Sequence, residues 1–165
     1  MFNKKKKKIG DSEDKNFAVY SERIFSQDEG LKDKAHQELV EALEDGKPFY
    51  LAEGIYFKAF YEMEQKTYVL EFYKNEEDKE PYRFILEKEE FDQLFDYVIA
   101  VREDIFSNIS ITKDSTVVLN LGRNAVGVYW LDIVQNQNMI IKVIGNRTLM
   151  IKLVHALFYA KHYEY

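Results

Sequence analysis

The clearest structural signal in this sequence is residues 66–106, KTYVLEFYKNEEDKEPYRFILEKEEFDQLFDYVIAVREDIF. Apolar and polar residues alternate with a period of two in Lys66–Tyr73 and again in Pro81–Glu87, which predicts two strands joined by a charged hairpin. In Lys88–Phe106 the apolar residues instead recur three and four positions apart, which is typical of an amphipathic helix. The order is therefore strand, turn, strand, helix.

The same order recurs in the second half of the chain. Ala125–Val134 and Met139–Ile144 read as strands, and Asn146–Tyr163 reads as a helix. Further apolar strands precede each unit, in Phe49–Glu64 and in Ile109–Leu121. The sequence therefore predicts an α+β fold of tandem β-β-β-β-α units, with antiparallel sheets that are each covered by a helix.

An N-terminal segment precedes these units. Asp28–Asp45 has apolar residues at helical spacing and Gly46 as its stop, which predicts an additional helix. Phe17–Phe25 alternates weakly and is a candidate strand. Lys4–Lys8 are five consecutive lysines in a charged tail that we expect to be disordered. The predicted divisions are a tail (1–16), a strand and helix segment (17–47), a first unit (48–108) and a second unit (109–165), with 48–165 as one compact domain.

Charge is distributed unevenly over the 165 residues, which carry a net charge of −6. The first unit has 7 Lys/Arg against 15 Asp/Glu, whereas the second has 6 against 3. A polyanion should therefore prefer the second unit. The absence of cysteine fits a reducing, cytoplasmic location, and no apolar run is long enough to predict a membrane helix.

Alternation along the strands predicts which side chains lie on the sheet faces that the helices do not cover. These faces combine aromatic rings with Lys and Arg, a combination that suits single-stranded nucleic acid because bases stack on the rings and cations follow the phosphates. A subunit interface or the seam between the two units is the alternative interpretation. The predicted binding residues are Tyr56, Lys58, Phe60, Tyr73, Arg83, Arg123, Trp130, Lys142 and Arg147.

Two tandem units of this kind resemble the Whirly/PC4/Pur-alpha group of single-stranded nucleic-acid-binding proteins. The best local match is Pro81–Phe106, where YRFILEKEEF resembles the last strand and following helix of PC4- and Whirly-like domains. The resemblance implies binding of single-stranded DNA, or RNA, on sheet surfaces, and a homodimer or higher oligomer. The acidic first unit and the additional N-terminal helix depart from that pattern.

Catalysis is not indicated by any motif in the sequence. His155 and His162 are seven residues apart on one predicted helix, but two histidines without a third ligand do not make a metal site. No glycine-rich phosphate loop or nucleophile elbow is present, so we expect no enzyme activity, metal or cofactor. The alternative function is an acidic protein-interaction or inhibitor module that docks on a basic partner.

Overall fold

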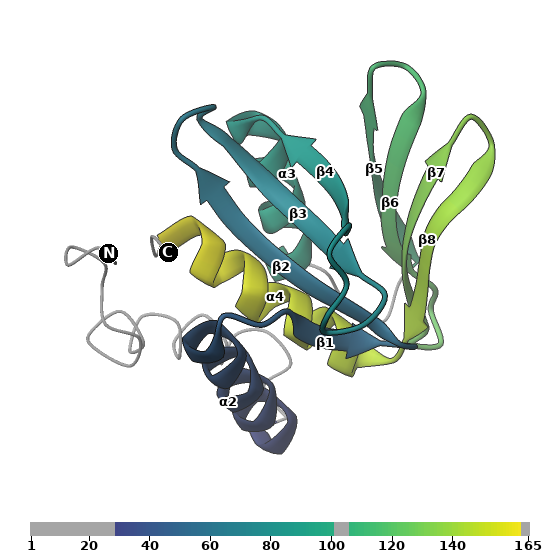
Figure 1. Ribbon diagram of the computed structural model, residues 1–165. Coiled ribbons are helices and arrows are strands. Elements are labelled where there is room, and N and C mark those ends of the chain that lie inside the picture. The colour runs from purple at the N-terminus through teal and green to yellow at the C-terminus, as the bar shows by residue number, and fades with distance from the viewer. Residues whose placement is uncertain (1–28, 101–105, 163–165) are drawn as a thin grey trace.

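The structure is a computed structural model that describes residues 29–100 and 106–162 (Figure 1). The candidate strand Phe17–Phe25 and the charged tail lie outside the described residues. The elements are α2 (Glu29–Asp45), β1 (Phe49–Ala52), β2 (Ile55–Glu62), β3 (Thr67–Tyr73), β4 (Tyr82–Leu86), α3 (Lys88–Ala100), β5 (Ser107–Lys113), β6 (Val117–Arg123), β7 (Tyr129–Gln135), β8 (Asn138–Gly145) and α4 (Arg147–His162).

Two four-stranded antiparallel sheets make up the strand structure. Their orders are β1-β2-β3-β4 and β5-β6-β7-β8, so within each sheet every strand pairs with its neighbours in sequence. Helix α3 follows the first sheet, α4 follows the second, and α2 precedes both. The predicted fold class, tandem β-β-β-β-α units with an additional N-terminal helix, is therefore confirmed.

The boundaries around the second unit differ from the predicted ones. Strand β7 begins at Tyr129 rather than Ala125, because the side-chain oxygen of Asn124 accepts the backbone N–H groups of Val126 and Val128 and closes a turn there. Gly127 has a φ of 93° in that turn, a backbone conformation that glycine adopts without strain. The predicted helix end at Phe106 is also wrong, since that residue is not helical and immediately precedes β5.

Helix α4 is buried on all sides. Every residue from Leu149 to Ala160 is buried, whereas a helix that only covers one sheet buries a single stripe. The helix contacts α2, α3, β1 and β2 as well as β7 and β8 of its own unit. The helix of the second unit thus also packs on the first sheet, as Figure 1 shows.

A polar network allows α4 to bury Lys152. The Nζ atom of Lys152 donates to the carbonyl oxygen of Tyr50 at 2.9 Å and lies 3.4 Å from a carboxylate oxygen of Glu38. It also lies 5.4 Å and 5.0 Å from the ring centroids of Phe49 and Tyr50. A buried ammonium requires such partners, so Lys152 ties α4 to both α2 and β1.

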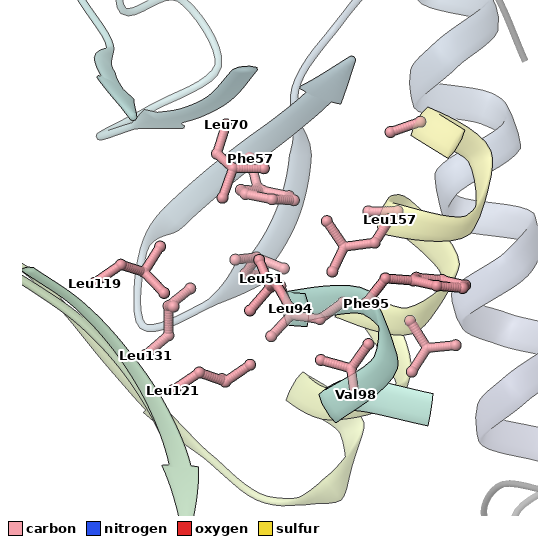
Figure 2. Close-up of a cluster of buried hydrophobic side chains, with 14 of the residues drawn as sticks. Leu51, Phe57, Leu70, Leu94, Phe95, Val98, Leu119, Leu121, Leu131 and Leu157 are labelled. Atoms are coloured by element: carbon pink, nitrogen blue, oxygen red, sulfur yellow. The ribbon is translucent and has the colours of Figure 1, made fainter. Parts of the chain in front are cut away.

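The two units share one hydrophobic core. In Figure 2, Leu119, Leu121 and Leu131 of the second sheet face a cluster that includes Leu51 of the first sheet and Leu157 of α4. Helix α3 contributes residues to the same core. Because each sheet buries its inner face in this shared core, units 48–108 and 109–165 should unfold together.

Truncating Leu157 to alanine tests that shared core. Leu157 is 1% exposed, and Leu→Ala changes at such positions cost about 2–5 kcal/mol. We expect Leu157→Ala to shift the urea midpoint equally by helix circular dichroism and by Trp130 fluorescence from the second sheet. Val126→Ala, at a side chain that is 84% exposed, is the control and should shift neither. Separate transitions for the two probes would contradict one core.

A histidine pair lies at the interface between α2 and α4. His36 Nε2 and the Tyr159 hydroxyl are hydrogen-bonded at 2.6 Å, and the rings of His36 and His155 are 5.8 Å apart. His155 is 2% exposed, and its Nδ1 donates to the carbonyl oxygen of Ile151 at 2.8 Å. Burial lowers the pKa of His155 to about 4, with the charges of His36 and Lys32 acting in the same direction.

Acid should therefore destabilise the protein through His155. The unfolded chain takes up a proton near pH 6.5, whereas the folded chain does so only near pH 4, so stability falls as the pH falls between these values. The full loss is about 3 kcal/mol. Between pH 6.5 and 5, the free energy of unfolding in urea should therefore fall less in His155→Leu than in the wild type. The control is His162→Leu, near the end of α4. Its free energy of unfolding should fall with pH as that of the wild type does.

Candidate nucleic-acid interface

The outer face of the first sheet, opposite the core, carries five of the predicted binding residues. Strand register places Tyr56 beside Tyr73. The next row on this face is Lys58, Glu71 and Arg83. The third row contains Phe60, next to Val69. Alternation therefore assigns Tyr56, Lys58, Phe60, Tyr73 and Arg83 to one face, as predicted.

The polar groups on this first face bind each other. Arg83 Nε lies 3.1 Å from a carboxylate oxygen of Glu71, and the Tyr73 hydroxyl donates to the other oxygen at 2.5 Å. Burial, together with the hydrogen bond to Glu71, raises the pKa of Tyr73 far above its usual value. Lys58 Nζ donates to the carbonyl oxygen of Gly46 at 3.4 Å. Glu71 at the centre makes this face a poor surface for phosphates.

The outer face of the second sheet carries the tryptophan. Trp130 shares a row with Asn108, Gly122 and Ile144, near one end of the sheet. Phe106, which is 62% exposed, lies beside Trp130 with 6.0 Å between the ring centroids. Two neighbouring aromatic rings thus lie on an open sheet face. Phe106 is not among the predicted binding residues, because the periodicity of Lys88–Phe106 places it at the end of a helix.

Gly122 allows the indole to lie against the sheet. A side-chain Cβ at this position would lie 2.7 Å from Cζ2 of Trp130 and 2.7 Å from Cβ of Asn108. Both distances are shorter than any ordinary carbon contact, so only glycine fits beneath the ring. The glycine therefore fixes the orientation of Trp130 on the open face.

The next row on this face is polar. It consists of Ser110, Asn120, Asp132 and Lys142, and the Ser110 hydroxyl donates to the side-chain oxygen of Asn120 at 2.6 Å. Burial raises the pKa of Asp132, and the charge of Lys142 partly offsets that effect. Asp132 is the one acidic residue in these two rows, which fits the lower acidity of the second unit.

Arg123 does not lie on this surface. It is the last residue of β6, two residues beyond the predicted strand end at Leu121, and alternation with Leu119 and Leu121 directs it to the inner face. Arg123 is 0% exposed, and its guanidinium carbon lies 5.5 Å from the Tyr129 ring centroid. Among the described residues, its nitrogens find no hydrogen-bond partner. Arg123 is therefore not available to bind a ligand on this surface, contrary to the prediction from the sequence.

Arg147 lies at the end of this sheet, as the first residue of α4. Asn146 caps that helix, because its side-chain oxygen accepts the backbone N–H of Thr148 at 2.9 Å. Arg147 and Lys142 are both exposed. We define the second-sheet surface as Phe106, Asn108, Trp130 and Lys142, together with Arg147 at the adjoining start of α4. It combines two rings with two exposed cations.

Comparisons with protein-family models, with curated proteins and with solved structures find no match to this chain. Within residues 29–100 and 106–162, no three His, Asp or Glu side chains cluster as metal ligands would. None of the described helices is long and apolar enough to cross a membrane. The candidate site therefore rests on the geometry of the second-sheet surface.

A methyl group added beneath the tryptophan tests the geometry of this surface. Gly122→Ala should displace Trp130 or Asn108 and destabilise the protein by about 1–3 kcal/mol, as overpacking does. The measurements are urea unfolding and the wavelength of Trp130 emission, which should change. Gly30→Ala is the control, because nothing lies within 4 Å of a Cβ there. Unchanged emission in Gly122→Ala would contradict the described contact.

Proposed function

We propose that this protein is a non-catalytic binding protein that holds single-stranded nucleic acid, DNA in preference to RNA, on the second-sheet surface. The observation that carries the proposal is the pair formed by Trp130 and Phe106 on an open face. Base stacking on an aromatic side chain contributes about 1–3 kcal/mol per base and tolerates any sequence. The cysteine-free composition suits a reducing, cytoplasmic setting for this function.

The polar residues around the rings support the same proposal. Asn108 and Asn120 supply amide groups that can hydrogen-bond to unstacked base edges, and Lys142 can contact a phosphate. Two exposed cations on this surface are few for a nucleic-acid site. Affinity should therefore depend on stacking more than on charge, unlike in proteins that bind through long basic grooves.

Titration of the protein with oligo-dT, followed by the fluorescence of its only tryptophan, Trp130, tests the proposal directly. We expect quenching of Trp130 emission, and a shallow salt dependence with a log–log slope between roughly −0.7 and −1.4 for one or two phosphate contacts. Lys142→Ala should weaken binding and reduce the slope by roughly 0.7. Absence of binding at low salt would overturn the proposal.

The contribution of stacking is measured separately by fluorescence anisotropy of a labelled oligo-dT. We expect Trp130→Ala to weaken binding by about 1–3 kcal/mol, the value of one stacked base. Tyr50→Ala is the matched control, because it removes an aromatic side chain that is 42% exposed on the other sheet. Circular dichroism of both variants checks that they fold. Equal affinity of the Trp130→Ala variant and the wild type would place binding elsewhere.

A second candidate function is docking on a basic protein partner through the acidic β3–β4 loop. Asp78 accepts the backbone N–H groups of Lys74 and Glu80 at 3.0 Å each, and Asn75 accepts that of Glu77 at 2.8 Å. These bonds hold exposed carboxylates in a fixed turn; the exposed carboxylates are Glu76, Glu77 and Glu80. Binding of an oligolysine peptide that is lost in Glu76→Lys/Glu77→Lys, without oligo-dT binding, would favour this function.

A further inference from the structure

Over about half of its length, one edge of β2 pairs with no strand among the described residues. Strand β1 pairs only with its first part, through Phe49 opposite Phe57 and Tyr50 opposite Tyr56. Residues 58–62 pair with β3 on one side, and no strand in the described chain pairs with their other side. Figure 1 shows β2 continuing past β1 above α4. The N–H and C=O groups on this edge, which pair with no described strand, can receive another strand.

A cavity of about 310 Å³ adjoins this edge. Its walls are mainly apolar and come from α2, β2 and α4, including Leu39, Leu43, Ala59 and Ala156. The volume is roughly ten times that of one water molecule, about 30 Å³. The small side chain of Ala59 lines this space beside the edge, which a strand paired with β2 would cover.

Residues 58–62, KAFYE, are complementary to themselves when two copies run antiparallel. With Phe60 opposite its own copy, Lys58 lies opposite Glu62 on the outer face, and this pair occurs twice. On the inner face, Ala59 lies opposite Tyr61, so that a small residue meets a large one. Tyr61 is 37% exposed, although its ring lies 5.0 Å from that of Tyr68.

We propose that two copies of this chain form a two-fold symmetric dimer through their β2 edges. Residues 58–62 of the two copies pair antiparallel about Phe60, and the two first sheets become one continuous sheet. Tyr61 of each copy packs over Ala59 of the other and closes the cavity there. A two-fold axis makes the two strands antiparallel by symmetry, and cross-strand neighbours with Cβ atoms about 4.5–5.5 Å apart make these contacts.

Self-pairing accounts for the charges better than an unrelated peptide does. A basic peptide would meet Lys58, and an acidic peptide would meet Glu62, whereas the second copy offers the opposite charge at both positions. This dimer uses the edge of the first sheet and leaves the second-sheet surface exposed. The proposal is therefore independent of nucleic-acid binding.

Charge exchange across the proposed pair tests the register. Sedimentation equilibrium should give the wild-type protein a mass approaching twice the 19.6 kDa of the chain as concentration rises. Lys58→Glu and Glu62→Lys each create two like-charge pairs, so each should weaken the dimer by about tenfold. The double variant restores opposite charges and should recover the dimer. Glu64→Lys, in the turn beyond β2, is the matched control and should dimerise as the wild type does.

A cysteine cross-link provides a test that does not depend on charge, because the chain has no cysteine of its own. Antiparallel partners have Cα atoms about 4.5–5.5 Å apart, within the range for a disulfide. Phe60→Cys should form a covalent dimer on mild oxidation, whereas Gln65→Cys in the exposed turn should not. Three results would overturn the proposal. The wild type could stay monomeric at all concentrations, the single variants Lys58→Glu and Glu62→Lys could dimerise as the wild type does, or the double variant could stay monomeric.

Discussion

The burial of α4 from Leu149 to Ala160 is the constraint on which the rest of this structure depends. The helix contacts α2, α3 and strands from both sheets, so between Leu149 and Ala160 it has no face left for water. Its two buried polar residues, Lys152 and His155, each have hydrogen-bond partners. Lys152 reaches the carbonyl oxygen of Tyr50 and the carboxylate of Glu38, and His155 is held neutral by burial and donates to Ile151. The surroundings of both side chains depend on the positions of α2 and β1.

This central helix also decides which surfaces remain for binding. The inner faces of both sheets are used in the shared core, so a ligand can meet only their outer faces, their edges and the loops. The outer face of the first sheet contains Glu71, which is bound by Arg83 and Tyr73. The outer face of the second sheet contains Trp130 and Phe106 beside one carboxylate, that of Asp132. The two units share an architecture, but their outer faces have different chemistry.

Small residues determine what each surface can accept. Gly122 lies under the indole of Trp130, and a side chain there would collide with the ring. Ala59 is one of the residues that line the cavity at the edge of β2. Neither residue can bind anything strongly itself. Each matters because its side chain is small, and the effect of that small size depends on the side chains around it.

The sequence by itself determined the order of the strands and helices and the faces to which most strand residues belong. Those features follow from local periodicity, and Tyr56, Lys58 and Trp130 lie on the faces that alternation predicts. Only the tertiary structure decided that Arg123 is buried, because a strand two residues longer moves it from a turn into the inner face. Only the tertiary structure decided that α4 is enclosed on every side, because Lys152 and His155 look exposed until α2 and β1 supply their surroundings. Local patterns record which way a side chain points, whereas burial depends on distant elements that pack against it.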